Sequence, residues 1–269
     1  MKFNNNIFQA CIRTSEENRL LQHFHNAYEL IFVEHGSARF KIGTSEYYAK
    51  ENALLLIGKL EGHEMHICER PYNRVYIQIT PQQLDSAISE AQLKSLFISR
   101  PPGFCHMFDL TPYREQVIKI IDSLMEENSQ PHAKTAAYSL LTLLIVLCFR
   151  CGGDQNKKNY ETPNKIIMEI QKYLDKNFTQ DIILKNLAEQ HFISESHLSH
   201  SFRKWTGKSP KQYIMNSRIA LAKELLLFDH YSIAVIAFKC GFSDVSNFIR
   251  YFKNETNMTP LKYRQKFHG

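Results

Sequence analysis

The sequence of 269 residues lacks an uninterrupted run of about 18 uncharged apolar residues, which a membrane-spanning helix requires. The nearest stretch, AAYSLLTLLIVLCF at 136–149, is shorter and predicts a buried helix. The first residues, MKFNNNIFQACIR, lack the apolar core of a signal peptide. We therefore expect a cytoplasmic protein without a membrane partner.

Paired cysteines are also scarce. Among the six cysteines, Cys148 and Cys151 have the Cys-x-x-Cys spacing, but the sequence contains no second pair to complete a zinc site. Isolated thiols are typical of buried cysteines in a reducing compartment. A redox switch at Cys148 and Cys151 remains an open alternative.

Acidic residues are few in the second half. Residues 153–269 contain 18 Lys and Arg against 11 Asp and Glu, a net charge of +7, whereas residues 1–152 contain 15 against 16, a net charge of −1. A neutral half joined to a basic half indicates a sensing or assembly module attached to a module that binds a polyanion.

A linker separates these halves. The stretch CGGDQNKKNYETPNK is rich first in Gly and then in Asn and Lys, and it ends in Thr-Pro. We predict a first domain at 1–151, a linker at 152–164 and a second domain at 165–269.

The first domain begins with strand-like alternation of apolar residues, seen in YELIFVEHGSARFKIG, ALLLIG and RVYIQIT. Several short strands separated by turns predict a β-barrel or sandwich. Two helices should follow, one at about 112–128 with Thr111 as its N-cap and one at about 133–150. The second is apolar on more than one face, so we expect a homodimer that buries LLTLLIVL.

The second domain contains an internal repeat. It opens with PNKIIMEIQKYLDKNF, a predicted helix with Tyr173 on its apolar face. LAEQHFISESHLSHSFRKWTGKSPKQYI then begins at Leu187 and corresponds to IAFKCGFSDVSNFIRYFKNETNMTPLKYR from Ile236. The spacing is 49 residues at first and 50 from Leu198 onward, so one extra residue lies in the turn of the second copy. Between the copies, SPKQYIMNSRIALAKELLLF predicts one helix of about five turns, roughly 30 Å long.

Each copy has the residue pattern of a helix-turn-helix. In the first copy, Ser194 can cap a second helix, and Phe202 lies one turn after Leu198 on its inward face. In the second copy, Gly241 permits a left-handed turn. Ser243 or Asp244 is predicted to cap the second helix, and Phe248 and Phe252 are predicted to face inward.

The opposite side of each second helix carries short polar residues followed by a basic one. Such residues suit insertion into a major groove, where they bond base edges, while nearby lysines neutralise phosphates. Two copies on one stiff helix of nearly one DNA turn could enter successive grooves. The predicted DNA-binding residues are Ser196, His197, Ser199, His200, Arg203, Lys204, Lys211, Val245, Ser246, Asn247, Arg250 and Lys253.

The second copy resembles the signature of the AraC/XylS family of transcription regulators, with Ile-Ala, Gly-Phe-Ser, Phe-x-x-x-Phe-Lys and Thr-Pro-x-x-Tyr-Arg in order. The resemblance extends from Lys165 to Phe267. It implies double-stranded DNA and RNA polymerase as partners, with base contacts on the outward residues. The family's usual glycine before Thr-Pro is Asn257 here, and Asn also tolerates left-handed geometry.

The first domain resembles the cupin-type sensor domain of many such regulators. HFHNAYELIFVEHG matches the first cupin metal motif through His23, His25, Glu29 and Gly36, whereas the second motif offers His63 but has Lys59 in its proline region. Strand alternation would turn His23 and His25 to one face, where a divalent ion could bind. Because regulators with this domain usually bind an organic effector, the prediction is effector binding without a metal or other cofactor, by His23, His25, Tyr28, Glu29 and His63.

The expected fold class is α+β in two domains: an N-terminal cupin-like β-barrel plus helices, and a C-terminal all-α domain with two helix-turn-helix motifs joined by a long helix. The expected function is transcription regulation by a small-molecule effector, by family analogy a sugar or related metabolite, without enzymatic activity. Two alternatives remain: a metal-binding cupin sensor or enzyme with an accessory basic domain, and a DNA-binding protein whose first domain only dimerises.

Overall fold

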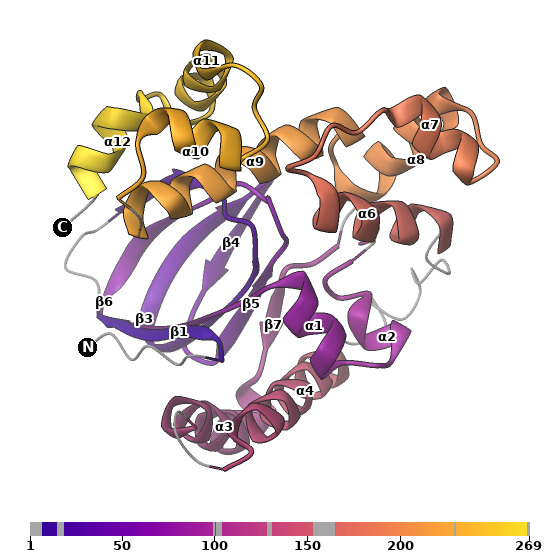
Figure 1. Ribbon diagram of the computed structural model, residues 1–269. Coiled ribbons are helices and arrows are strands. Elements are labelled where there is room, and N and C mark those ends of the chain that lie inside the picture. Colours follow the sequence, from indigo (N-terminus) through magenta and orange to yellow (C-terminus); the bar gives the residue numbers. More distant parts are fainter. Residues whose placement is uncertain are drawn as a thin grey trace. The chain divides into compact units, whose positions relative to one another are not determined.

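The computed structural model describes residues 7–14, 19–98, 100, 104–127, 131–152, 165–228 and 230–267. The chain divides into two compact units, Met1–Thr162 and Pro163–Gly269. The division falls within the predicted linker, of which residues 153–164 lie outside the described part. The first unit is built on a sheet and the second is helical, so the predicted two-domain α+β class is confirmed (Figure 1).

The first unit is an antiparallel half-barrel. Its strands are β1 (Gln9–Thr14), β2 (Arg19–His23), β3 (Tyr28–Ile42), β4 (Ser45–Ala49), β5 (Ala53–Ile57), β6 (His63–Ile79) and β7 (Met107–Asp109). They pair in the order β1-β6-β3-β5-β7, with β2 also on β6 and β4 also on β3. The two long strands, β3 and β6, pair with each other and curve across the sheet (Figure 1).

Strand β3 changes the parity of its inward-facing residues. Odd-numbered apolar residues up to Val33 belong to the barrel core, whereas even-numbered ones do so from Ala38 onward. The pairing with β6 is irregular between these positions, so a bulge shifts the alternation by one residue. Gly36 lies in the bulge with φ of 76°, and a Cβ there would collide with the carbonyl oxygens of Glu69 and Pro71.

Short helices and two longer ones complete the first unit: α1 (Pro81–Ala87), α2 (Ala91–Lys94), the 3-10 turn η1 (Thr111–Tyr113), α3 (Arg114–Glu126) and α4 (Ala133–Cys151). The predicted N-cap Thr111 is wrong. Thr111 begins η1, and its backbone N–H and hydroxyl donate to Asp109 Oδ1 at 3.0 and 2.6 Å. Asp109 was missed because it belongs to β7, a three-residue strand too short for a periodic signal.

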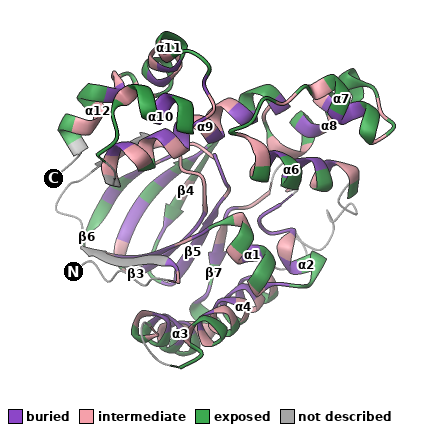
Figure 2. Cartoon of the chain, viewed as in Figure 1, coloured by how far each residue is buried: buried purple, intermediate pink, exposed green. Residues whose placement is uncertain are grey.

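Helix α4 is long and apolar enough to cross a membrane by length and composition alone. It packs instead against α1, α2, α3 and β7, and the Thr142 hydroxyl donates to the Ala87 carbonyl at 3.0 Å. One side of the helix is buried in its own unit, through Ala137, Leu141, Leu144, Ile145, Leu147 and Cys148 (Figure 2). The stretch 136–149 is therefore part of a packed helix, as predicted.

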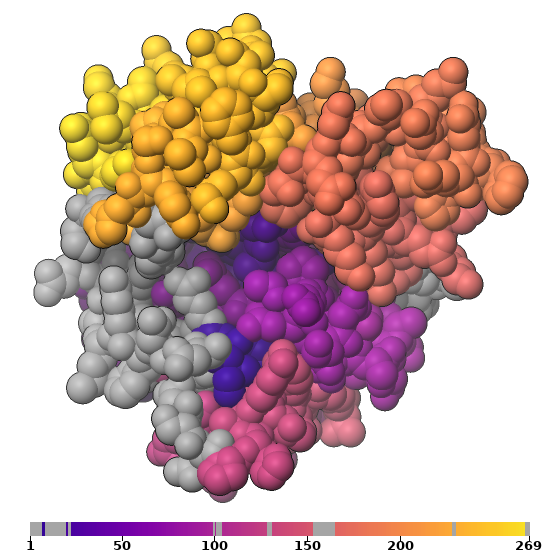
Figure 3. All heavy atoms as spheres, in the orientation of Figure 1, coloured from indigo at the N-terminus to yellow at the C-terminus, as the bar shows by residue number. Residues whose placement is uncertain are grey.

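The second unit consists of helices: α6 (Lys165–Asn177), α7 (Leu184–Gln190), α8 (Glu195–Thr206), α9 (Pro210–Phe228), α10 (Ile233–Lys239), α11 (Val245–Thr256) and α12 (Pro260–Phe267). The predicted connector is α9, a single helix of 19 residues. Helices α7 and α8 lie at one end of α9 and α10–α12 at the other (Figure 1). In the space-filling view, the orange-red atoms of the start of this unit and the yellow atoms of its end form two groups (Figure 3). The connector is buried on several sides, because Tyr213, Ile219, Ala222 and Leu226 are all nearly inaccessible.

The prediction for the first helix of this unit needs one correction. Tyr173 is 41% exposed, whereas Gln171 is buried with Ile167, Ile170 and Leu174. Gln171 Nε2 donates to the Tyr213 hydroxyl at 3.3 Å, so a polar residue joins the apolar face by means of a buried hydrogen bond to α9. Periodicity alone cannot indicate such a partner.

Candidate functional site

The repeat predicted from sequence is reproduced in side-chain packing. The rings of Phe202 and Tyr213 meet edge to face with centroids 5.3 Å apart and an interplanar angle of 80°. Fifty residues on, Phe252 and Tyr263 meet at 5.4 Å and 84°. Each pair docks the second helix of a helix-turn-helix onto the helix that follows it.

Hydrogen bonds repeat at the same spacing. The hydroxyl of Thr206, the last residue of α8, lies 2.8 Å from the Phe202 carbonyl in the helix and 2.9 Å from the Lys208 carbonyl in the loop that follows. Thr256 occupies the equivalent place at the end of α11, with distances of 2.7 and 2.9 Å to the corresponding carbonyls. The left-handed C-caps are Gly207 (φ 73°) and Asn257 (φ 57°), which confirms that Asn replaces the usual glycine without changing the backbone.

The second helix of each helix-turn-helix, α8 or α11, begins with a side-chain cap. Ser194 accepts from the backbone of His197 at 3.1 Å, and Asp244 accepts from that of Asn247 at 2.7 Å. Ser243 and Asp244 were the two predicted caps for α11, and in the structure the N-cap is Asp244. The extra residue of the second turn is then Ser243, since four residues separate α7 from α8 and five separate α10 from α11.

The outward side of α8 and α11 is open to solvent. Leu198 and Phe202 on α8, and Phe248 and Phe252 on α11, are fully buried as predicted. All the predicted DNA-binding residues are exposed except Ser199 and Val245, which are half-buried (Figure 2). We call the outward side chains at 196–203 of α8 and 245–250 of α11 the reading face. On α11, Arg250 Nη2 donates to Asn247 Oδ1 at 2.9 Å, which orders these two side chains.

Two arginines of the second unit, Arg218 and Arg264, donate hydrogen bonds to backbone carbonyls of neighbouring segments. Arg218 of α9 donates to the backbone carbonyls of Phe178 and Gln180, at 2.7 and 2.8 Å. Arg264 of α12 donates to the Tyr231 carbonyl at 2.6 Å. Its guanidinium holds α12 to the loop before α10.

A second cluster of polar side chains lies in the half-barrel. His23 ends β2, His25 follows it, Glu29 lies on β3, and His63 begins β6 directly opposite His23 in the ladder. We call these four residues the His-Glu cluster. Ring nitrogens of the three histidines lie within 4.8 Å of one another. Sequence correctly suggested that they converge, but His25 joins them from a loop and not by strand alternation.

Glu29 is the buried centre of the His-Glu cluster, with 6% of its surface exposed. Its Oε2 lies 3.3 Å from His25 Nε2 and 3.2 Å from His63 Nε2, and its Oε1 accepts from Gln78 Nε2 at 3.2 Å. Burial alone would raise the pKa of this carboxyl, but His25 and His63 hold the pKa well below its usual range. The site therefore presents a buried negative charge surrounded by imidazoles.

A neighbouring network supports the loop before β6. Glu61 Oε1 accepts from His106 Nε2 at 2.9 Å, and its Oε2 accepts from Arg100 Nη1 at 3.0 Å and from the Gly58 backbone at 2.7 Å. Burial raises the pKa of Glu61, but these donors lower the pKa to about 2. His106 Nδ1 in turn lies 2.8 Å from the Tyr47 hydroxyl.

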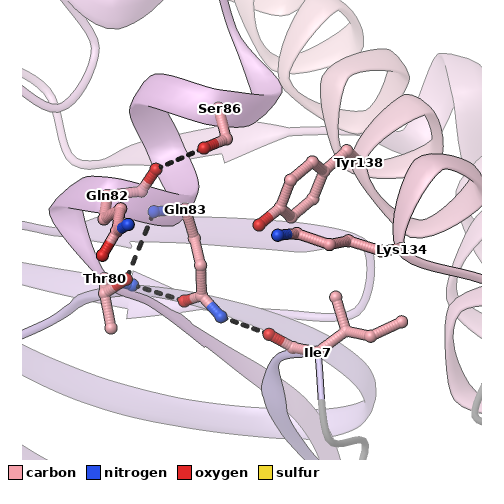
Figure 4. Close-up of a pocket in the computed structure, with 7 residues that line it drawn as sticks. All are labelled: Ile7, Thr80, Gln82, Gln83, Ser86, Lys134 and Tyr138. Atoms are coloured by element: carbon pink, nitrogen blue, oxygen red, sulfur yellow. Dashed lines mark hydrogen bonds between the residues drawn. The ribbon is translucent and has the colours of Figure 1, made fainter.

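A pocket of about 350 Å³ lies elsewhere in the first unit, between the start of β1, α1 and α4 (Figure 4). Its lining is mostly polar. Gln83 reaches across it to donate to the Ile7 carbonyl, and the same residue forms a capping box with Thr80 (Figure 4). The Tyr138 hydroxyl and Lys134 ammonium point toward the Gln83 side of the pocket (Figure 4). Sequence reading did not identify this pocket, because its residues come from three distant segments.

Comparison with known proteins agrees with both units. Residues 9–145 match the family model of an AraC-like ligand binding domain, which spans half of the chain, and residues 187–266 match a helix-turn-helix domain. The chain belongs to the AraC family of transcriptional regulators.

Curated relatives of this AraC-family protein include HTH-type transcriptional activators named RhaS. RhaS of Salmonella schwarzengrund (strain CVM19633) is 23% identical over 248 residues, which cover 91% of this chain and 87% of RhaS. RhaS of Escherichia coli (strain SMS-3-5 / SECEC) is 24% identical over 253 residues, covering 92% and 88%.

Solved structures of ToxT from Vibrio cholerae share the fold. One aligns with a TM-score of 0.67 at 14% identity, covering 97% of this chain and 99% of ToxT. A ToxT structure with bound unsaturated fatty acid aligns with a TM-score of 0.61 at 15% identity, covering 98% and 97%. At this identity the likeness establishes the architecture of the AraC-family chain.

The structure separates one predicted effector residue from the others. Tyr28 precedes Glu29 on β3, so its side chain points to the opposite face of the sheet. Its buried ring meets Phe97 edge to face at 5.4 Å. Sequence reading also missed Gln78, which a strand far along the chain brings opposite Glu29. Its only signal in the sequence is a polar residue between two isoleucines in RVYIQIT, which is too weak to interpret without the register.

Proposed function

We propose that this AraC-family protein is a cytoplasmic, sequence-specific DNA-binding regulator whose reading face contacts base edges in two successive major grooves. The observation that carries the proposal is the duplicated helix-turn-helix on one buried connector. A helix of 19 residues is about 28 Å long, close to the 34–36 Å that separates successive major grooves on one side of B-DNA. The net charge of +7 on residues 153–269 supports association with a polyanion.

The half-barrel would bind the effector that controls this activity. Hydrogen-bonding groups at the buried Glu29 and His63 and at the half-buried His25 and Gln78 favour a ligand with several hydroxyl groups, hence a sugar or related metabolite. An effector acts by preferring one arrangement of the two units over another. Catalytic turnover is unnecessary for this role, and we propose that the protein is not an enzyme.

Two further partners are proposed. RNA polymerase would be contacted at the promoter, and activation is favoured because the RhaS relatives are named transcriptional activators. A second copy of the chain would bind α4, although its own unit already covers much of LLTLLIVL. Leu143 is 46% exposed, and it leaves an apolar surface between the half-buried Leu140 and Val146.

Two experiments test the proposal. Genome-wide mapping of occupied sites should yield a common motif, and the neighbouring genes would indicate the effector. A thermal-shift screen with sugars and with carboxylic acids should then raise the melting temperature for one class only. Occupancy without a motif would contradict sequence-specific binding, and a protein that binds its motif but no small molecule would leave the first unit as a dimerisation module.

A further inference from the structure

We propose that the polar pocket between the start of β1, α1 and α4 binds a small phosphorylated ligand, with its phosphate group held by Lys134 and Tyr138 (Figure 4). The pocket shares no residue with the His-Glu cluster, so this inference goes beyond the effector binding proposed for the half-barrel. Its volume of about 350 Å³ lies within the range of pockets that bind small organic molecules.

The lining of the pocket carries positive charge only. Among the described residues that line it, Lys134 is the single charged side chain. In the described part of the chain, no carboxylate pairs with Lys134. The acidic residue of α1, Asp85, is already paired with Lys94 at 2.7 Å. The Lys134 ammonium is therefore available to an anionic ligand.

Other groups that face the pocket are free to donate hydrogen bonds. The Tyr138 hydroxyl has no hydrogen-bond partner among the described residues, and Tyr138 lies four residues after Lys134 on the same side of α4. Gln83 Nε2 uses one of its two hydrogens for the Ile7 carbonyl and retains the other. An ammonium, a phenol and an amide N–H together are donors for the oxygens of an anion.

Contacts between side chains hold these donors in place. The Tyr138 ring lies against the buried Phe8 ring, with centroids 5.6 Å apart, and Lys134 Nζ lies 5.5 Å from the centre of the Tyr138 ring. On the facing wall, Gln83 Oε1 accepts from the Thr80 backbone at 2.8 Å. Figure 4 shows the ammonium and the phenol directed toward Gln83. Donors that are held before a ligand arrives lower the entropic cost of binding.

A phosphate group suits these donors better than a carboxylate. A phosphate ester carries nearly two negative charges at neutral pH and presents three acceptor oxygens. Lysine binds phosphate as a point charge, whereas a planar carboxylate is best matched by the fork of an arginine. The described lining contains lysine and no arginine. The volume of the pocket also leaves room for an organic group beside the phosphate.

A ligand in this pocket would link two parts of the first unit. Helix α1 follows β6 directly, so Thr80 in the pocket lies two residues after Gln78, which contacts Glu29 in the His-Glu cluster. Helix α4 carries Leu143 on the surface proposed for dimerisation. Phosphate binding would therefore hold α1 and α4 together next to both of these sites.

The test is isothermal titration calorimetry of the full-length protein at constant ionic strength. The probes are inorganic phosphate and glycerol 3-phosphate, with glycerol as the uncharged comparison. We expect saturation at about one phosphate compound per chain and no binding of glycerol. Lys134→Gln should weaken binding about tenfold or more, and Tyr138→Phe, which keeps the ring, should weaken it about fivefold.

The matched control is Lys119→Gln, which removes an exposed positive charge from α3 in the same unit and should leave phosphate binding unchanged. His25→Gln, in the His-Glu cluster, should leave it unchanged as well. The inference fails if neither phosphate compound binds saturably, if the Lys119 and Lys134 variants lose affinity equally, or if only His25→Gln abolishes binding. Tighter binding of glycerol 3-phosphate would support an organic phosphate as the ligand, and equal affinity would support free phosphate.

Discussion

Gly241 determines both the backbone conformation of a turn and the close approach of a neighbouring loop. It has φ of 86° in the turn of the second helix-turn-helix, and a Cβ there would collide with the backbone of Thr179, in the loop after α6. Gly207 has a similar φ of 73°, but an added Cβ would meet open space. A comparison of substitutions at the two glycines therefore separates the energetic cost of backbone strain from the cost of a steric collision.

We predict that Gly207→Ala costs about 1 kcal/mol, the strain of a left-handed residue, and that Gly241→Ala costs about 3 kcal/mol or more because it also breaks packing. The single tryptophan, Trp205 in α8, reports on unfolding of the helical unit. Denaturant midpoints followed by its fluorescence give the comparison. Equal shifts for the two variants would contradict the assigned contact with Thr179.

The buried side chain of Lys223 should make the stability of the helical unit depend on pH. Its burial on α9 lowers its pKa to about 8, only partly opposed by Glu255. Between pH 8 and the ordinary lysine pKa of about 10.4, the unfolded chain binds more protons than the folded one, so this group makes stability rise with pH. Below pH 8 the folded state carries the full cost of the buried charge.

Lys223→Met should therefore stabilise the helical unit at pH 7 by roughly 2 kcal/mol, with the gain shrinking as pH rises toward 10. Lys223→Arg, which stays charged, should show no such recovery. Trp205 fluorescence during denaturation at several pH values measures both. A gain that is the same at pH 7 and pH 10 would show that lost charge is not its cause.

In the proposed function, DNA recognition depends on two elements, α8 and α11. Their caps, inward Phe residues and left-handed ends were predictable, because each is a short-range pattern that occurs twice. The choice of Asp244 over Ser243 was not, since both residue types cap helices and only the length of the turn separates them. The carbonyl contact of Arg264 was not predictable for a similar reason: a basic residue in this domain has the same sequence signal whether or not it also holds a backbone carbonyl.

We predict that His200→Ala and Asn247→Ala each reduce discrimination between the mapped DNA site and a shuffled sequence by about 1–3 kcal/mol. Competition binding measures this ratio. The control is Asn254→Ala, an exposed residue of α11 two turns further from its N-terminus. Unchanged discrimination in both first variants would show that the reading face has been wrongly assigned.

At the scale of whole units, the half-barrel was only partly predictable. Long strands such as β3 have clear periodicity, but β1, β2, β4 and β7 are short. The bulge at Gly36 also reverses the alternation that a period-two pattern relies on. The His-Glu cluster was predicted from its residue types, while Gln78 and Glu61 required the three-dimensional pairing.

For the whole molecule, we predict how a substitution on α4 changes the oligomeric state. Leu143→Glu places a charge on the apolar surface of α4 without disturbing the buried side of the helix, and should convert a dimer into a monomer. Sedimentation velocity measures the change, with Lys41→Glu, an exposed change on β3, as the control. A variant that remains dimeric would place the interface elsewhere.

The most direct test of the central claim is the salt dependence of binding between the full-length protein and a mapped promoter fragment. We predict affinity that falls linearly on logarithmic axes as salt rises, with Lys211→Ala weakening all sequences alike and reducing the slope by about 1. Lys41→Ala should leave the slope unchanged. Binding that shows no salt dependence, or no binding to any mapped fragment, would contradict the assignment of the duplicated helix-turn-helix as the DNA-binding element.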